Sequence, residues 1–78
     1  MQMFITITIK TSGGEADIRI DYEQKISEGL KVLRESGRLP DGRSPDFFSS
    51  CVRENLVSAY KTFREEFIFD GDILTAVE

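Results

Sequence analysis

Histidine and tryptophan are missing from this sequence of 78 residues, and Cys51 is its only cysteine. Without histidine, the chain lacks the usual general base for a serine or cysteine nucleophile and the commonest zinc ligand. A lone cysteine cannot form an internal disulfide and is more often a small buried apolar group than a nucleophile. These absences predict a protein that is not an enzyme and that holds no metal or other cofactor.

Clusters of basic residues and long apolar runs are missing too. The 14 acidic and 10 basic side chains give a net charge of -4, and both signs are scattered along the chain. Such a surface disfavours nucleic acid and anionic lipid as partners. The apolar runs are far shorter than the roughly 20 residues of a membrane-spanning helix, and the opening MQMFITITIK alternates, unlike a signal peptide. We therefore expect a cytoplasmic protein that does not insert into a membrane.

The composition is that of a folded protein, because 40% of the residues are apolar and 31% are charged. No repeat or low-complexity tract interrupts the chain. Since its length is near the lower limit for a domain without disulfides or metals, we expect residues 1–78 to form a single domain.

Two strands are predicted near the start of the chain. Residues 4–9, FITITI, alternate between a face of three isoleucines and a face that carries Phe4 and two threonines. Period-two alternation of β-branched residues is typical of a half-buried strand. The turn residues KTSGG follow, and residues 16–20 then alternate again. The pattern predicts an antiparallel hairpin.

One amphipathic helix is predicted over residues 22–36, because Ile26, Leu30 and Leu33 recur at i, i+4 and i+7. Its outer side is charged.

Residues at both ends of this helix predict where it starts and where it stops. Asp21 is placed to cap its N-terminus, with Gln24 at the position of a capping-box partner. At the other end Gly37 is expected to stop the helix, Leu39 to supply the apolar contact that follows, and Pro40 to prevent continuation.

A third strand is predicted over residues 47–53, FFSSCVR, and its register has two solutions. Either the odd-numbered residues, such as Phe47 and Cys51, face the core, or the even-numbered ones, such as Phe48 and Val52, do. We favour the even-numbered set because Val52 is the better core residue. A slip of one residue would exchange the two faces.

The remaining residues predict a short strand around 56–59, an irregular segment at 60–69, a turn at 70–71 and a closing strand, ILTAV, at 73–77. A helical or 3₁₀ turn is possible in the irregular segment because apolar residues recur there at helical spacing. These are Phe63, Phe67 and Ile68.

This order of elements predicts an α+β fold. A hairpin followed by one helix buries the apolar stripe of the helix only by laying it across the sheet. The last strand is expected to pair beside the first in the middle of the sheet, so that both ends of the chain stabilise the core. The result is a ubiquitin-like β-grasp, with a mixed four- to five-stranded sheet and one helix packed across it.

The C-terminal third resembles that of ubiquitin-like proteins. In the run NLVSAYKTFREEFIFDGDILTAV, five residues occupy positions that this fold buries, and SGRLPDG resembles the sequence after the ubiquitin helix. The five residues are Leu56, Phe63, Ile68, Leu74 and Ala76.

Within that superfamily, FITITIK and FIFDGDILTAVE resemble the openings and endings of the YukD/EsaB group. Members are ubiquitin-like proteins of about this length that are encoded with type VII secretion systems. The polar centre of FFSSCVR and the loop at residues 40–46 depart from the group's pattern.

The resemblance implies a non-enzymatic protein-binding module, a cytoplasmic accessory or regulatory component of a bacterial type VII (ESX-like) secretion system. Its partner would be a protein component of that apparatus. Ubiquitin and the sulfur carriers use a C-terminal Gly-Gly tail for activation, whereas residues 75–78 read TAVE and Gly13-Gly14 belongs to the predicted hairpin. We therefore expect no conjugation to targets. The alternatives are a self-associating structural β-grasp domain, which would form a homodimer, and, less favoured, a sulfur-carrier-like protein.

Strand alternation also names candidate contact residues. Six phenylalanines and two tyrosines are ample for so small a core, so some rings among Phe4, Phe47 and Phe69 are expected on the sheet face that the helix leaves open. Asp70 and Asp72 form a DxD pair, which we assign to turn chemistry because two carboxylates supply too few ligands for calcium. The candidate protein-binding face consists of Phe4, Thr6, Thr8, Phe47 and Thr75.

Overall fold

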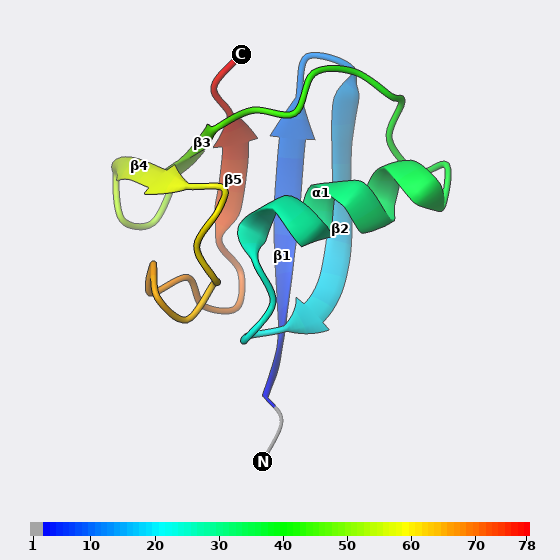
Figure 1. Cartoon of the computed structure of the whole chain (residues 1–78). Coiled ribbons are helices and arrows are strands. Elements are labelled where there is room, and N and C mark those ends of the chain that lie inside the picture. Colours follow the sequence, from blue (N-terminus) through cyan, green and yellow to red (C-terminus); the bar gives the residue numbers. More distant parts are fainter. Residues whose placement is uncertain (1–2) are drawn as a thin grey trace.

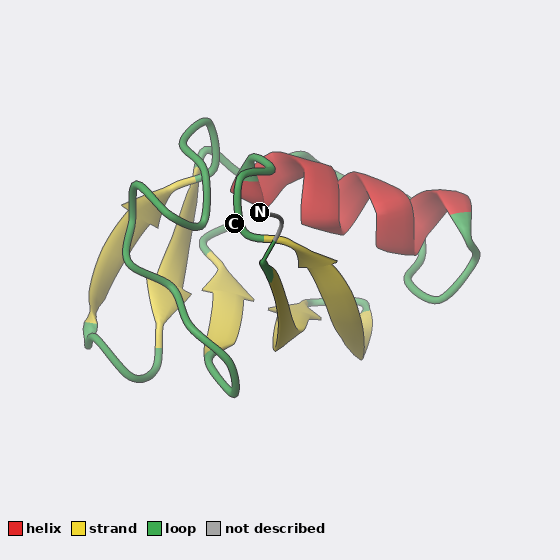
Figure 2. Ribbon diagram, turned by 90° about the horizontal axis from the view of Figure 1, so that it is seen from below, coloured by secondary structure: helices red, strands yellow, loops and turns green. Residues whose placement is uncertain are grey.

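The computed structural model describes residues 3–78 and shows one five-stranded sheet crossed by one helix (Figure 1). The strands lie in the order β2-β1-β5-β3-β4, and α1 lies over β1 and β2 on one face of the sheet (Figures 1 and 2). The elements are β1 (Phe4–Thr11), β2 (Gly14–Asp21), α1 (Ile26–Glu35), β3 (Phe47–Ser50), β4 (Asn55–Ser58) and β5 (Ile73–Ala76).

The closing strand occupies the centre of the sheet. β5 pairs in parallel with β1, where Ile9 is opposite Leu74, and antiparallel with β3, where Ser49 is opposite Thr75. Gly71 has a φ of +85° in the turn that leads into β5, a conformation that glycine adopts without steric cost. A mixed sheet with a central last strand and one helix across it confirms the predicted β-grasp.

The N-terminal hairpin follows the predicted alternation. β1 and β2 pair without interruption from Phe4 opposite Asp21 to Thr11 opposite Gly14. The inward side chains of both strands lie under α1, and most are buried. They are Ile5, Ile7, Ile9, Ala16, Ile18 and Ile20, of which Ala16 is half-buried.

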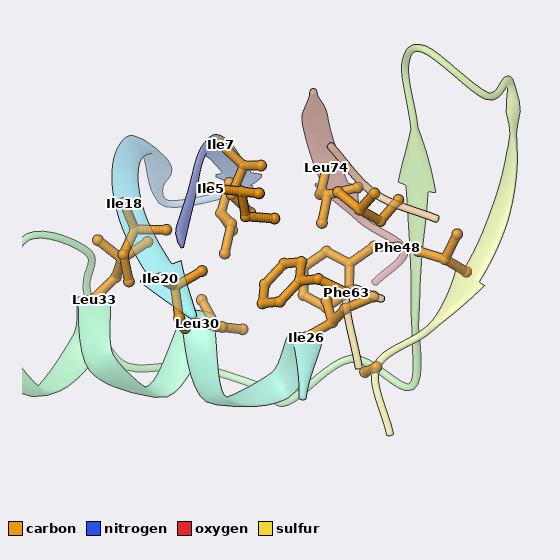
Figure 3. Packing of buried hydrophobic residues seen from close by; sticks show 14 of the residues in the cluster. Ile5, Ile7, Ile18, Ile20, Ile26, Leu30, Leu33, Phe48, Phe63 and Leu74 are labelled. Atoms are coloured by element: carbon orange, nitrogen blue, oxygen red, sulfur yellow. The ribbon is translucent and has the colours of Figure 1, made fainter. Parts of the chain in front are cut away.

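The irregular segment between β4 and β5 completes the core beside the helix. Its Ala59, Phe63 and Ile68 are fully buried, and the Phe63 ring lies between Ile26 and the part of the sheet that carries Leu74 (Figure 3). Phe63 and Ile68 therefore occupy the buried positions that the resemblance implied. The segment forms turns, and neither an α-helix nor a 3₁₀-helix.

The predicted start of the helix is wrong, because α1 begins at Ile26 and Asp21 does not cap it. Asp21 Oδ1 instead accepts a hydrogen bond from the Glu23 N–H (2.9 Å) in a turn that precedes the helix. The first helical N–H groups, of Ile26 and Ser27, donate to the backbone carbonyls of residues 61 and 59 (2.9 and 2.8 Å). A neighbouring segment thus supplies the acceptors that a side-chain cap would give.

The predicted helix stop is confirmed. Gly37 has a φ of +79°, and its N–H donates to the Arg34 carbonyl (3.1 Å). The Arg38 N–H donates to the Leu33 carbonyl (3.0 Å), which completes a Schellman motif, and Leu39 is buried beyond it. The last helical residue is Glu35, one position before the predicted end.

The favoured register of β3 is confirmed for Phe48 and Ser50, which are both buried, but it fails beyond them. The strand ends at Ser50, and the chain turns over residues 51–54, so Val52 is 71% exposed. Cys51 is exposed in the same turn. The alternation cannot continue because the Glu54 N–H donates to the Ser50 carbonyl (2.9 Å) and closes the turn.

Leu56, which was expected inside, lies outside, and Phe67 is exposed as well. Leu56 is exposed because β4 presents its neighbour Val57 to the core. Phe67 is exposed and has a φ of +56°, since the chain reverses at that point and returns Ile68 to the core. Leu74 is buried and Ala76 half-buried, as expected.

Candidate protein-binding face

The sheet face opposite α1, here called the open face, carries all five predicted contact residues. Strand alternation turns their side chains away from the buried isoleucines of β1 and from Phe48 and Leu74. Figure 2 shows α1 on the other side of the sheet. Phe4, Thr6, Phe47 and Thr75 are exposed and Thr8 is half-buried.

An apolar patch forms at one end of the open face, and we call its four residues the Phe47 patch: Phe47, Leu56, Thr75 and Val77. The Val77 N–H donates to the Phe47 carbonyl (3.0 Å), which places these two residues side by side. Leu56 is opposite Ser49 in the β3–β4 pair and therefore diagonal to Phe47. The apolar side chains Phe47, Leu56 and Val77 are 48%, 59% and 46% exposed.

The predicted residues do not form one continuous patch, because Phe4 lies at the opposite end of the sheet. Lys10, Thr75 and Ser49 share one row across β1, β5 and β3. Phe47 is two residues beyond that row and Phe4 is six residues before it. At about 3.3 Å per residue, Phe4 and Phe47 are separated by roughly 25 Å along the strands.

The two threonines between these ends belong to the polar centre of the open face. Thr8 Oγ1 donates to Asp17 Oδ1 (2.5 Å) across the β1–β2 pair. The Thr6 N–H donates to Asp70 Oδ1 (2.6 Å), which fixes the turn before β5 against β1. Thr6 and Thr8 thus make hydrogen bonds within the domain, whereas Phe47 and Thr75 belong to the apolar patch.

Arginine and aromatic side chains meet at the other end of the molecule. The Arg19 guanidinium lies over the Phe4 ring, 5.2 Å from its centroid. Phe69 stacks on the buried Tyr22 ring with centroids 5.7 Å apart. The expectation that some of Phe4, Phe47 and Phe69 are exposed is confirmed for all three.

Phe67 is exposed and has a strained backbone. A substitution at this position can therefore test whether the strain lowers the stability of the fold. A left-handed conformation costs a residue with a Cβ about 1–2 kcal/mol, which asparagine tolerates better than most residues. Against this cost, the Arg53 guanidinium lies 5.3 Å from the Phe67 ring centroid, a contact that contributes about 0.5–1 kcal/mol at an exposed site. We expect Phe67→Asn to raise the free energy of unfolding by roughly 0.5–1 kcal/mol, measured by urea denaturation.

The matched control for this substitution is Phe69→Asn, two residues along the same segment. Phe69 has no positive φ and stacks on Tyr22, so its replacement should lower stability. Equal losses from both substitutions would show that the backbone at Phe67 stores no strain.

The two aspartates of the DGD turn, Asp70 and Asp72, accept hydrogen bonds that hold the turn in place. Asp70 Oδ1 accepts from Thr6, and the buried Asp72 carboxylate accepts from Ser50 Oγ (2.6 Å) and from the N–H groups of Val52 (3.1 Å) and Ile73 (2.7 Å). These bonds are the turn chemistry that the sequence indicated. Within residues 3–78, no three acidic, cysteine or histidine side chains gather as they would around a metal ion.

Sequence reasoning missed a hollow of about 510 Å³ between α1 and the loop at residues 41–45. Leu30 and Phe48 are among its apolar lining residues. Arg34 fixes the loop by donating to the carbonyls of Pro40 (3.1 Å) and Arg43 (2.9 Å). The hollow lies on the helix side of the sheet and is separate from the open face.

Tyr60 borders the same hollow and donates its hydroxyl hydrogen bond to Asp46. This hydrogen bond and the charge of Asp46 raise the pKa of Tyr60 above its usual value. The phenol therefore stays protonated at neutral pH and joins the loop to the end of β4.

No family model and no curated protein matches the sequence. Among solved structures, the fold is similar to that of the EccD5 ubiquitin-like domain from Mycobacterium xenopi, with a TM-score of 0.53 and 20% sequence identity. The match covers 97% of this chain and 97% of that domain. The likeness shows that the chain has the ubiquitin-like β-grasp fold. No helix in the described part of the chain has the length and apolar character to cross a membrane.

Proposed function

We propose that this protein is a non-enzymatic, ubiquitin-like binding module and a cytoplasmic accessory or regulatory component of a bacterial type VII secretion system. It acts by docking the Phe47 patch onto another protein of that apparatus. The observation that carries the proposal is the patch itself, three exposed apolar side chains gathered on a sheet face opposite the helix.

Two likenesses support the link to secretion. The sequence resembles the YukD/EsaB group at both its opening and its closing strand. The fold is similar over nearly the whole chain to the ubiquitin-like domain of EccD5, a type VII secretion component. One likeness is in residues and the other in backbone geometry, and both are to proteins of the same apparatus.

The physical argument for docking is the composition of the patch. Scattered exposed apolar residues are ordinary, but a group of them on a flat face is typical of a surface that another molecule covers. An aromatic ring such as Phe47, packed among smaller apolar neighbours, is the kind of anchor that dominates binding energy at protein interfaces. Ser49 lies within the patch, between Thr75 and Leu56, and Ser58, opposite Phe47, would form part of a polar rim.

Residues 77 and 78 are hydrogen-bonded to the rest of the domain. The Val77 N–H is bonded to β3, and Glu78 Oε1 accepts a hydrogen bond from the Ser12 N–H (3.0 Å). Hydrogen bonds from Ser12 also lower the pKa of the Glu78 carboxyl. Both residues thus belong to the folded surface.

The proposal predicts that Phe47→Asp abolishes capture of secretion-apparatus proteins from the native cell. A charge at the centre of a desolvated contact costs more than about 2 kcal/mol, so recovery of the partner should fall by at least about thirtyfold. The measurement is quantitative mass spectrometry after affinity capture with the tagged chain. Val52→Asp is the matched control, because Val52 is exposed at a turn outside the patch.

Two outcomes would contradict this function. Equal capture of the partner by the wild-type chain and by Phe47→Asp would show that the Phe47 patch does not bind it. A concentration-dependent dimer in light scattering that dissociates on Phe47→Asp would favour the self-associating alternative. Neighbouring genes for a membrane ATPase and for small helical secreted proteins would strengthen the secretion link.

A further inference from the structure

β2 is the longer of the two edge strands of the sheet. It has eight residues and a neighbour only on the β1 side, whereas β4, at the other edge, has four residues. In the β1–β2 pair, every residue from Phe4 to Thr11 has a partner, so no bulge twists this edge away from an incoming strand. β2 also contains no proline. It therefore lacks most of the devices that protect edge strands from pairing.

The register identifies which backbone groups of β2 point outward. The Tyr22 N–H donates to the Met3 carbonyl (2.8 Å), whereas the Thr8 N–H donates toward β5 (3.0 Å). The odd-numbered residues of β1 therefore bond to β2, and through the register they bond to its even-numbered residues. The N–H and C=O groups of Glu15, Asp17 and Arg19 consequently face away from the sheet.

A groove runs beside this edge. Its hollow of about 330 Å³ is lined on the helix side by Ile18 and Ile20 of β2 and by Val32 of α1, and its other lining residues are Phe4, Arg19, Asp21 and Gln24. Val32 is 46% exposed, although it lies on a helix whose other apolar residues are buried. A strand added to β2 would place every second side chain into this groove, against Val32.

The other face of β2 has a distinct charge. Glu15, Asp17, Arg19 and Asp21 all project to the open face, since the side chains between them face the helix. Three carboxylates and one guanidinium give this edge a net charge of -2, counted over β2 alone. An added strand is therefore favoured when the side chains on its open-face side are basic.

The same charges argue against a second copy of this chain as the added strand. In antiparallel self-pairing centred on Asp17, this carboxylate faces its own copy. When the pairing is centred on Ile18, Glu15 faces Asp21, and when it is centred on Arg19, Asp17 faces Asp21. Each of these registers sets carboxylates directly opposite each other, which is destabilising.

We propose that the free edge of β2 binds an extended segment of another protein by strand addition, and that this segment alternates apolar with basic residues. Its apolar side chains enter the groove beside Val32, and its lysines or arginines lie opposite Glu15, Asp17 and Asp21. The segment bonds to the outward backbone groups of Glu15, Asp17 and Arg19. This surface is separate from the Phe47 patch, which lies over β3, β4 and β5.

The test uses an acetylated and amidated decapeptide in which valine and isoleucine alternate with lysine and arginine. Amide hydrogen exchange of the intact chain is followed by NMR with and without the peptide. We expect exchange of the Glu15, Asp17 and Arg19 N–H groups to slow by at least about tenfold at saturation. The N–H groups of Asn55–Ser58 in β4 should be unchanged.

Variants separate strand addition from simple charge attraction. Val32→Asn should lower the affinity of the chain for the peptide about fivefold. Its matched control, Val52→Asn, should leave this affinity unchanged. Glu15→Gln should weaken binding and reduce its salt dependence, whereas Glu35→Gln, on the exposed side of α1, should not. A peptide with N-methyl groups at alternate residues on its pairing edge should not bind, since it cannot donate to β2.

Three results would overturn the proposal. They are unchanged exchange in β2 at saturating peptide, protection in β4 instead, and binding of the N-methylated peptide as tight as that of the parent. A dimer of the chain with protected β2 amides would assign the edge to a second copy. None of these results bears on capture through the Phe47 patch, so the two proposals fail separately.

Discussion

Replacing Asp72 with alanine is expected to lower the free energy of unfolding by roughly 2–4 kcal/mol. The Asp72 carboxylate is 2% exposed and accepts three hydrogen bonds, from Ser50 Oγ and from the N–H groups of Val52 and Ile73. Ser50 Oγ in turn accepts from the Arg53 N–H (3.1 Å). Alanine would leave this buried set of donors without its acceptor, at the point where the β3–β4 turn meets the start of β5.

Urea denaturation of three variants makes the prediction specific. Asp72→Asn retains an oxygen for the two backbone N–H groups, and its amide can donate to Ser50, so its cost should be about half that of alanine. Asp70→Ala removes one hydrogen bond at an exposed residue of the same turn and should cost less than about 1 kcal/mol. A loss from Asp72→Ala no larger than that from Asp70→Ala would show that the buried network contributes little.

The contrast between these two aspartates shows where sequence reasoning stops. In DGDIL both have the chemistry of a turn, and the turn was predicted. Nothing local distinguishes the exposed Asp70 from the buried Asp72, because two of the three donors to Asp72 come from residues about 20 positions earlier in the chain. Whether a polar side chain is buried depends on which distant segment packs beside it. The periodic pattern of apolar residues in the sequence does not reveal that segment.

The same limit explains the errors around β3 and β4. Alternation predicted the inward residues Phe48 and Ser50, but not the position where the strand ends, and Val52 was misplaced as a result. Likewise the helix started four residues later than predicted, because backbone carbonyls of the segment at 59–61 cap it. Periodic patterns are set by local geometry, whereas these boundaries are set by tertiary hydrogen bonds.

The candidate face was predictable in part for the same reason. Period-two alternation placed Phe4, Thr6, Thr8, Phe47 and Thr75 on the open face, and their side chains lie there. Which of them gather depends on the register across β1, β5 and β3, which brings Leu56 and Val77 to Phe47 and leaves Phe4 at the other end. Their role in binding stays a prediction.

The second large effect is expected from Phe63→Ala, which should cost roughly 3–5 kcal/mol. Phe63 is fully buried although it belongs to a segment without regular secondary structure, and its ring lies between Ile26 and the sheet. A domain of this size has a total stability of about 4–12 kcal/mol, so this one substitution would remove much of it. Thermal unfolding followed by circular dichroism measures the loss. Phe69→Ala is the control, because it removes a ring of equal size that is largely exposed.

Gly29 allows the packing of Phe63 to be tested without unfolding the protein. A Cβ added at Gly29 would lie 3.3 Å from both Phe63 Cζ and Ile9 Cδ1, so helix and ring are in close contact there. Alone, Gly29→Ala gains about 1 kcal/mol of helix propensity and loses part of it to this crowding. With Phe63→Leu the crowding from the ring is relieved, and Gly29→Ala should become more favourable by about 0.5–1 kcal/mol in a double-mutant cycle. A coupling energy near zero would mean that Phe63 does not press against α1, and the large cost expected for Phe63→Ala would then need another cause.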